Sequence, residues 1–268
     1  MPIVNERCAS ERGICEHGAC HDGAALSMAT APEASRAWLL VEHQGPWPAE
    51  PTEAEQPGRL GELVSAAAAL GIRVQLIRRP GRRASLGADE PRTVFAGWTA
   101  GDAPWLRRGE LGPGSVLDLS ALAEGRTPGF GASSDEPVFL VCVHGRRDMC
   151  CARLGVPLAQ SLAARYPAQV WETTHVGGHK YAGNLVILPH GLYYGPVGVV
   201  EATASIEAYG RGSILADRFR GRAGQPRELQ EKEYGRLTEA GSLPLGVVSS
   251  GPAVSPGRLG PLGNRPAG

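Results

Sequence analysis

The sequence of 268 residues has no long apolar run, no excess of charge of either sign and almost no lysine. No window approaches the roughly 18–20 apolar residues of a membrane-spanning helix, and the first residues lack the apolar core of a signal peptide. Lys plus Arg and Asp plus Glu number 27 each, so no overall charge favours nucleic acid or a membrane surface. Only Lys180 and Lys232 are lysines. We therefore expect a soluble, cytoplasmic protein that binds neither nucleic acid nor a membrane.

Cysteine is also scarce, and its six copies are unevenly placed. In the cytoplasm, cysteines serve more often as metal ligands or reactive groups than as structural disulfides. Residues 139–196 hold three of the six cysteines and four of the seven histidines. The first 33 residues lack apolar periodicity, and their thiols and imidazoles match no established ligand spacing, so we interpret them as a flexible arm. These thiols and imidazoles are Cys8, Cys15, Cys20, His17 and His21.

The residues from 36 to 96 show the pattern of a strand, a helix and two further strands. Strands are predicted for Trp38–Glu42, Val74–Ile77 and Thr93–Ala96 from their apolar and β-branched content. Between the first two strands, apolar residues at helical spacing over 60–68 indicate a helix, and Gly71 is its termination signal.

The same order returns in the second half of the chain. An apolar run over 138–143 predicts a buried strand, and a stripe from Leu158 to Tyr166 predicts a helix that begins near Pro157. The further predicted elements are strands over 169–172, 184–188 and 192–194, a closing helix over 200–209 with an extension through Ile214 to Phe219 left open, and a charged helix over 226–240.

This repeated order predicts an α/β protein of the thioredoxin-like class, with two similar β-α-β-β halves and the metal site in the second. Gly, Pro and Ser dominate the C-terminal residues, which leaves little that can pack. The predicted organisation is a flexible arm (1–33), an N-terminal half (34–110), a connection (111–135), a C-terminal half (136–240) and a disordered tail (241–268).

Thiols and imidazoles gather at two places in the second half. Cys142 lies near the end of the strand over 138–143, and Cys151 follows it, while His175 and His179 share one glycine-rich loop. Sulfur together with imidazole suits zinc, copper or iron–sulfur chemistry.

Three readings of this inventory remain open from the residues alone. A structural zinc module for protein interaction would use the two histidines, but Gly177 and Gly178 disfavour the usual helix, and eight residues separate Cys142 from Cys151. A Rieske-type cluster would need a later Cys-x-x-His, which is absent. A thiol-dependent oxidoreductase would use Cys150 and Cys151, which are adjacent and lack the Cys-x-x-Cys spacing.

The segments 142–148 (CVHGRRD) and 175–184 (HVGGHKYAGN), together with Cys151, resemble the sucrase/ferredoxin-like family of thioredoxin-like [2Fe–2S] proteins. The resemblance extends from about Trp38 to about Tyr209 and includes the segments 42–47 and 78–82. Cys150, which lies beside an expected ligand, is a departure from the pattern.

The resemblance implies a [2Fe–2S] cluster held by Cys142, Cys151, His175 and His179, in an electron carrier rather than a self-sufficient enzyme, with a redox partner protein. Two ferric ions, two sulfides, two thiolates and two neutral imidazoles sum to zero, so an added electron enters a neutral group. We therefore expect a potential in the range of roughly −150 to +300 mV known for such ligand sets, above the about −400 mV of plant-type ferredoxins. Since each imidazole binds iron through one nitrogen, the other can titrate and couple reduction to proton uptake.

Residues beside the expected ligands are candidates to orient them. His144, Arg147 and Asp148 could hydrogen-bond sulfur or imidazole, and a helix starting near Pro157 would direct its positive end toward Cys151. The four arginines of segment 78–83 form either a solvated loop or a docking patch for an acidic redox partner.

Overall fold

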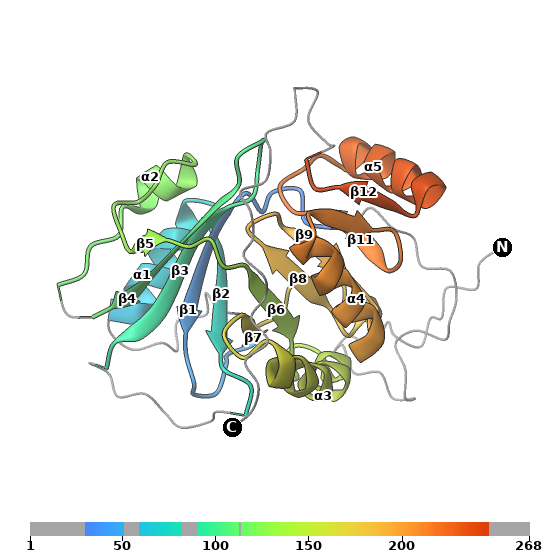
Figure 1. The fold of residues 1–268 in the computed structure, drawn as a ribbon. Coiled ribbons are helices and arrows are strands. Elements are labelled where there is room, and N and C mark those ends of the chain that lie inside the picture. Colours follow the sequence, from blue (N-terminus) through green and yellow to red (C-terminus); the bar gives the residue numbers. More distant parts are fainter. Residues whose placement is uncertain (1–29, 51–58, 82–89, 113, 247–268) are drawn as a thin grey trace, which may run out of the picture.

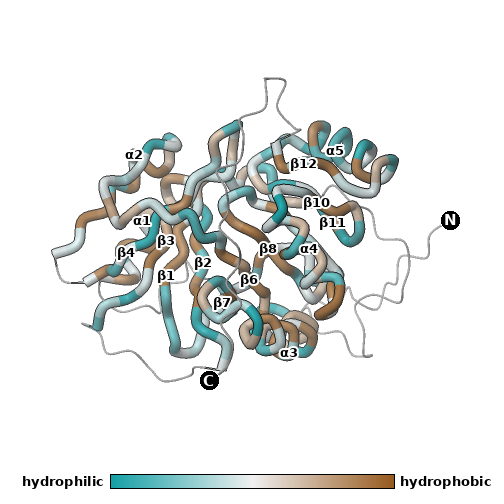
Figure 2. Tube along the Cα trace, in the orientation of Figure 1, coloured by the Kyte–Doolittle hydropathy of each residue, from teal (hydrophilic) through white to brown (hydrophobic). Residues whose placement is uncertain are grey.

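The computed structural model describes residues 30–50, 59–81, 90–112 and 114–246 (Figure 1). A single ten-stranded mixed sheet runs through both halves, in the order β11-β9-β8-β6-β7-β2-β1-β3-β4-β5. Helices α1, α3 and α4 lie along this sheet, and β1, β6 and β8 are apolar over most of their length (Figure 2). The predicted α/β, thioredoxin-like fold class is confirmed. Most of the predicted flexible arm, with Cys8, Cys15 and Cys20, lies outside the described residues.

The first half has the predicted β-α-β-β order. Strand β1 pairs in parallel with β2 and antiparallel with β3, and β3 pairs antiparallel with β4. The elements are β1 (Ala37–Glu42), α1 (Arg59–Ala69), β2 (Arg73–Arg78), β3 (Arg92–Trp98) and β4 (Trp105–Leu111). Strand β4 was not predicted, because its sequence WLRRGEL carries three charged residues and little apolar alternation. The predicted connection contains α2 (Leu119–Ala123) and β5 (Ala132–Ser133), which extends the sheet beyond β4.

The second half repeats this arrangement strand for strand. Strand β6 pairs in parallel with β7 and antiparallel with β8, and β8 pairs antiparallel with β9. The elements are β6 (Val138–Cys142), α3 (Met149–Arg165), β7 (Val170–Thr173), β8 (Leu185–Leu188), β9 (Leu192–Tyr194) and α4 (Val199–Gly210). A short 3-10 helix, His179–Tyr181, lies between β7 and β8.

The predicted start of α3 near Pro157 is wrong. The helix begins at Met149, where the side chain of Asp148 accepts a hydrogen bond of 2.8 Å from the amide of Cys150 and caps the first turn. Pro157 lies inside the helix, where it lacks one backbone donor. The consequence is that Cys150 and Cys151 belong to the first turn of the helix rather than to a loop before it.

The C-terminal region also differs from the prediction. Helix α4 ends at Gly210, so the extension to Phe219 is wrong, and β10 (Ser213–Leu215) and β11 (Phe219–Arg222) follow instead. The charged helix is confirmed as α5 (Arg227–Ala240). The tail was predicted to begin at residue 241, but β12 (Ser242–Pro244) pairs with β10 and Leu245 is buried. The predicted tail beyond residue 246 lies outside the described residues.

The two halves meet where β2 and β7 pair antiparallel, with Arg78 opposite Glu172. The Arg78 guanidinium forms an ion pair with Glu172 at 2.7 Å, and both side chains are largely buried. Arg79 lies 3.7 Å from the ring centre of Trp171 and donates to the backbone carbonyls of Pro167, Ala168 and Val170. These two arginines therefore join the halves. Arg82 and Arg83 lie outside the described residues, so the choice between a solvated loop and a docking patch stays open.

Candidate functional site

Cys142 is the last residue of β6, and its side chain is fully buried. Its sulfur accepts hydrogen bonds from the backbone amides of His144 and Val176 and from the thiol of Cys151. The hydrogen bond from Cys151 is the main cause that lowers the pKa of Cys142, and burial opposes it. Three donors, from β6's own turn, from α3 and from the loop after β7, thus converge on one sulfur.

Cys151 completes the pair from the first turn of α3. Its thiol proton is held by Cys142, and this hydrogen bond together with burial raises the pKa of Cys151 well above its ordinary range. The helix approaches β6 closely because residue 155 is glycine: a Cβ there would collide with the carbonyl oxygen of Cys142. Likewise, a Cβ at Gly145 would lie 2.7 Å from the Cβ of Ala152. Small residues at both contacts let the two thiols meet.

His175 follows β7 in the loop that donates to Cys142 through Val176. Its backbone amide donates to Nδ1 of His144 at 3.1 Å, and its own Nε2 is buried without a hydrogen-bond partner. Burial, followed by the charge of Arg147, lowers the pKa of His175 to about 4. The imidazole is therefore neutral at physiological pH and presents an unused nitrogen, which is the form that binds a metal ion.

His179 begins the 3-10 helix at the other end of the same loop, and its side chain is 39% exposed. Its Nδ1 lies 3.8 Å from the Oδ2 atom of Asp148, the residue that caps α3. The turn between the two histidines requires glycine, since Gly177 and Gly178 have φ angles of 96° and 71°. The predicted role of Asp148 as a neighbour of the ligands stays a prediction, but its position beside His179 supports it.

The four predicted ligands are brought to one end of the second half. The two thiols are in hydrogen-bond contact, and the histidine loop lies against Cys142 through the amide of Val176. Within the described ranges, however, no group of three or more His, Cys, Asp or Glu is arranged to hold a metal ion. Two thiols and two imidazoles are the donor types of a mixed-ligand [2Fe–2S] group, and the same donors also suit zinc.

The remaining candidates have different roles. His144 is buried, accepts from the amide of His175 and makes an edge-on contact with Trp47. Arg147 forms an ion pair with Glu50 and is about half exposed. Cys142 and Cys151 are free thiols, whereas Cys150 is disulfide-bonded and is not available as a competing ligand.

One residue beside the site was missed by the sequence reasoning. Arg220 of β11 is almost fully buried, and its charge interacts with the sulfurs of Cys142 and Cys151. No local signal marks it, because arginine is the usual cation of this sequence and no strand was predicted over 219–222.

Residues 28–221 match the sequence model of a family described as Sucrase/ferredoxin-like. The chain belongs to the sucrase/ferredoxin-like family. The match covers both halves of the ten-stranded sheet and all four predicted ligands, and it confirms the resemblance that the segments 142–148 and 175–184 indicated.

Two curated relatives share part of the chain. "Altered inheritance of mitochondria protein 32" of Meyerozyma guilliermondii is 36% identical over 105 residues, which cover 33% of this chain and 35% of that protein. The protein of the same name in Candida glabrata is 28% identical over 96 residues, which cover 30% and 31%. The chain thus matches about a third of the length of these relatives. No solved structure matches.

The location of this protein in the cell stays a prediction. The names of the two relatives refer to mitochondria, but those names do not establish where this chain is located. Among the helices that the structure describes, none combines the length and the apolarity that crossing a membrane requires.

Proposed function

We propose that this chain carries a [2Fe–2S] cluster on Cys142, Cys151, His175 and His179 and transfers single electrons to or from a partner protein. The observation that carries the proposal is the buried, unpartnered Nε2 of His175, in the loop whose next amide donates to the sulfur of Cys142. A buried polar atom without a partner is costly, and a metal bond would satisfy it. The sulfur and imidazole donors supplied here are those of a mixed-ligand cluster.

The residues around the site would tune that cluster. When bound, the cluster supplies a one-electron couple. The amides of His144 and Val176 stabilise negative charge on the sulfur of Cys142, which makes the thiolate form easier to maintain. Together these donors favour addition of an electron.

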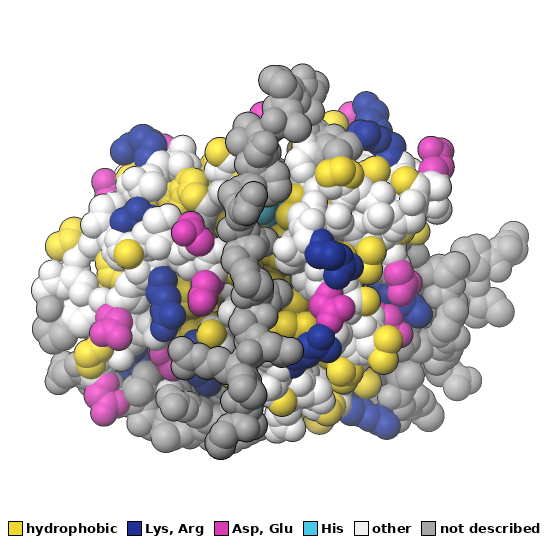
Figure 3. All heavy atoms as spheres, in the orientation of Figure 1, with side chains coloured by type: hydrophobic (Ala, Val, Ile, Leu, Met, Phe, Trp, Pro, Cys, Tyr) yellow, Lys and Arg dark blue, Asp and Glu magenta, His cyan; other side chains and the backbone are white. Residues whose placement is uncertain are grey.

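The exposed edge of the site lies at His179. Cys142 and Cys151 are buried and His175 is partly buried, whereas the side chain of His179 is 39% exposed. Electron exchange with a partner protein would therefore occur on the His179 side. The face seen in Figure 3 carries acidic and basic side chains interspersed, so that face does not favour a partner of strong charge of one sign.

The alternatives lack a supporting observation. A structural zinc module usually has two to four residues between its paired cysteines, whereas eight residues separate Cys142 from Cys151. A thiol oxidoreductase using Cys150 and Cys151 would require two free, accessible sulfurs, but Cys150 is disulfide-bonded and Cys151 is fully buried.

Metal analysis tests the proposal directly. The chain should be purified under low oxygen and assayed for iron, acid-labile sulfide and zinc, together with its visible spectrum. We expect two irons and two sulfides per chain and a reddish-brown colour. One zinc per chain without iron would contradict the proposal, and so would a colourless chain that takes up no iron during anaerobic reconstitution with iron and sulfide.

A further inference from the structure

Within the described part of the chain, Arg220 is a buried cation without an acidic partner. The residue is 2% exposed, and none of the ion pairs of the described residues involves it. Arg222, two positions later on the same strand, provides the contrast: it is also buried, but it pairs with Glu233 at 2.8 Å. An uncompensated buried charge is strongly destabilising. A charged, buried Arg220 therefore indicates a nearby anion other than the aspartates and glutamates that form ion pairs among the described residues.

An irregularity in β11 directs this side chain inward. The register between β11 and β9 shifts between Phe219 and Gly221, so Arg220 occupies a bulge. Bulges re-aim side chains and are frequent next to functional sites. Gly221 has a φ of 123°, and a Cβ there would collide with the side chain of Gln230 on α5, so only glycine fits.

Neutral groups hold the guanidinium in place. Its Nη1 donates to the Oδ1 atom of Asn184, and its Nε donates to the hydroxyl of Thr30 at 3.0 Å. Its Cζ atom lies 4.1 Å from the ring centre of Tyr181. None of these partners carries a negative charge. They fix the position of the guanidinium and leave its charge uncompensated.

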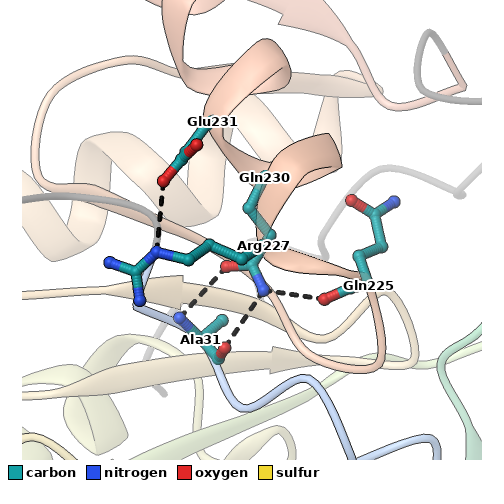
Figure 4. Close-up of polar contacts among 5 residues, drawn as sticks. All are labelled: Ala31, Gln225, Arg227, Gln230 and Glu231. Atoms are coloured by element: carbon teal, nitrogen blue, oxygen red, sulfur yellow. Dashed lines mark hydrogen bonds and ion pairs between the residues drawn. The ribbon is translucent and has the colours of Figure 1, made fainter.

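The segment that contains Thr30 is itself anchored from α5. Figure 4 shows Gln230 contacting both backbone groups of Ala31: its Oε1 accepts from the amide at 3.1 Å and its Nε2 donates to the carbonyl at 3.0 Å. The amide of Thr30 donates to the carbonyl of Arg220 at 2.7 Å. Helix α5 and β11 thus hold Thr30 against the arginine.

The guanidinium lies under the turn between the two candidate histidine ligands. A Cβ on Gly178 would come within 2.5 Å of Nη2 of Arg220, and Asn184, which binds Arg220, also donates to the carbonyl of Gly178 at 3.1 Å. Asn184 also accepts, through its backbone carbonyl, a hydrogen bond of 3.1 Å from the amide of Cys142, so one residue contacts both the arginine and this candidate ligand. Burial lowers the pKa of Arg220, and Tyr193, Tyr181, Cys142 and Cys151, in that order, act to raise it. In a dry interior such an interaction is much stronger than in water.

We propose that Arg220 is a positioning residue that compensates the negative charge of the Cys142 and Cys151 thiolates and of an electron delivered by the redox partner. This inference rests on the proposed function. Reduction adds one negative charge to the cluster, and the fixed cation lowers the free energy of that product more than that of the oxidised form. Arg220 therefore raises the reduction potential without binding iron.

The test compares reduction potentials of four proteins, each titrated with dithionite in a mediated redox titration. For Arg220→Gln we expect the equilibrium constant for reduction to fall at least tenfold, which lowers the potential by about 59 mV. Arg220→Lys keeps the charge and should stay closer to the wild type than Arg220→Gln does. Arg222→Gln is the matched control: it breaks a buried ion pair and should lower thermal stability while the potential stays unchanged.

Several outcomes would overturn the inference. An unchanged potential in Arg220→Gln would do so, and so would an equal shift in Arg220→Lys. If the glutamine variant loses iron, retention of iron by the lysine variant supports the charge requirement, and loss by both contradicts it. Asn184→Asp provides a variant that neutralises Arg220 without removing it; it should also lower the potential, and an unchanged value would contradict the inference. If the wild-type chain itself contains no iron and sulfide, the proposed function fails together with this inference. If the wild type holds a cluster and the Arg220 variants keep its potential, only this inference fails.

Discussion

The two halves of the molecule share one β-α-β-β arrangement, yet they end their first strand differently. Strand β1 ends at Glu42, whose carboxylate accepts hydrogen bonds from Gln44 at 3.1 Å and from the amide of Thr93 at 3.3 Å, both within the first half. Strand β6 ends at Cys142, whose sulfur lies beside a second free thiol and a loop with an unpartnered imidazole. In the first half, the side chain at the end of the strand is hydrogen-bonded to neighbours within that half. In the second half, the equivalent strand end leaves thiol and imidazole donors for a ligand.

The strongest way to test this comparison is to remove the candidate ligands. Cys142→Ser, Cys151→Ser, His175→Ala and His179→Ala should each abolish the native cluster, as measured by iron content, visible absorbance and electron paramagnetic resonance. Glu42→Gln, at the matching strand end of the first half, should keep it. Serine variants of Cys8, Cys15, Cys20 and Cys150 should also keep it.

One pattern would reverse the ligand assignment. A colourless Cys150→Ser protein beside an intact Cys151→Ser protein would show that the first of the two adjacent cysteines binds the cluster.

The close packing of α3 on β6 predicts a large stability effect. Gly155→Ala places a Cβ against the carbonyl of Cys142 and should lower the free energy of unfolding by about 3 kcal/mol. The cluster content should fall as well, because the helix carries Cys151. Gly235→Ala in α5, where no atom lies within 4 Å of a Cβ, should instead stabilise the chain by about 0.5–1 kcal/mol. Chemical denaturation measures both, and equal effects would show that the contact at residue 155 is not tight.

Acid should weaken the second half through His190, in the turn between β8 and β9. Burial lowers the pKa of His190 to about 4, and its Nδ1 lies 2.7 Å from the hydroxyl of Tyr209. Because the unfolded chain binds this proton near pH 6.5, the stabilisation is complete above that pH and is lost as the pH falls toward 4. The loss amounts to roughly 3 kcal/mol at most. The matching turn of the first half, over 99–104, contains no histidine.

Denaturation at a series of pH values checks this effect. His190→Gln should show a smaller loss of stability between pH 7 and pH 4 than the wild type. Parallel curves for the two proteins would assign the acid sensitivity to other groups.

The smallest predicted effect concerns the potential of the cluster. Ferrous iron withdraws less electron density from an imidazole than ferric iron, so the reduced state holds the outer ring proton more tightly. The potential should fall as the pH rises through the oxidised-state pKa, with a slope approaching about 59 mV per pH unit for one proton per electron. The exposed ring of His179 suits such exchange with water. A reduction potential that does not change between about pH 6 and pH 10 would contradict the coupling of electron uptake to proton uptake. It would not contradict the ligand assignment.

Sequence reasoning predicted the β-α-β-β order of each half, because apolar runs leave local patterns; the four ligands stay a prediction. The apolar runs at β1 and β6 and the paired motifs around Cys142 and His175 are visible without neighbours. The start of α3 was misplaced since Pro157 suits a first turn, although Asp148 was the true cap. Strand β4 is charged on its exposed face, and its pairing with β3 decides its structure.

Long-range features could not be predicted in the same way. The bulge that turns Arg220 inward depends on its pairing with β9 and on the side chain of Gln230. The pairing of β2 with β7 joins residues nearly a hundred positions apart, and the sequence of neither strand indicates which strand it will pair with. Such contacts follow from the assembled sheet rather than from local sequence.

The seam between β2 and β7 has a consequence for symmetry. These strands occupy equivalent places in the two halves, and they pair antiparallel, which is how two copies related by a two-fold axis would meet along their edges. The two halves of this one chain are thus arranged as the two subunits of a homodimer would be. An isolated second half would present β7 as an open edge, free to pair with another copy of itself. In this chain, β2 of the first half covers the edge of β7. The first half holds no candidate ligand at its own strand end, Glu42, so its sequence can differ from that of the second half while the pairing of β2 with β7 is kept.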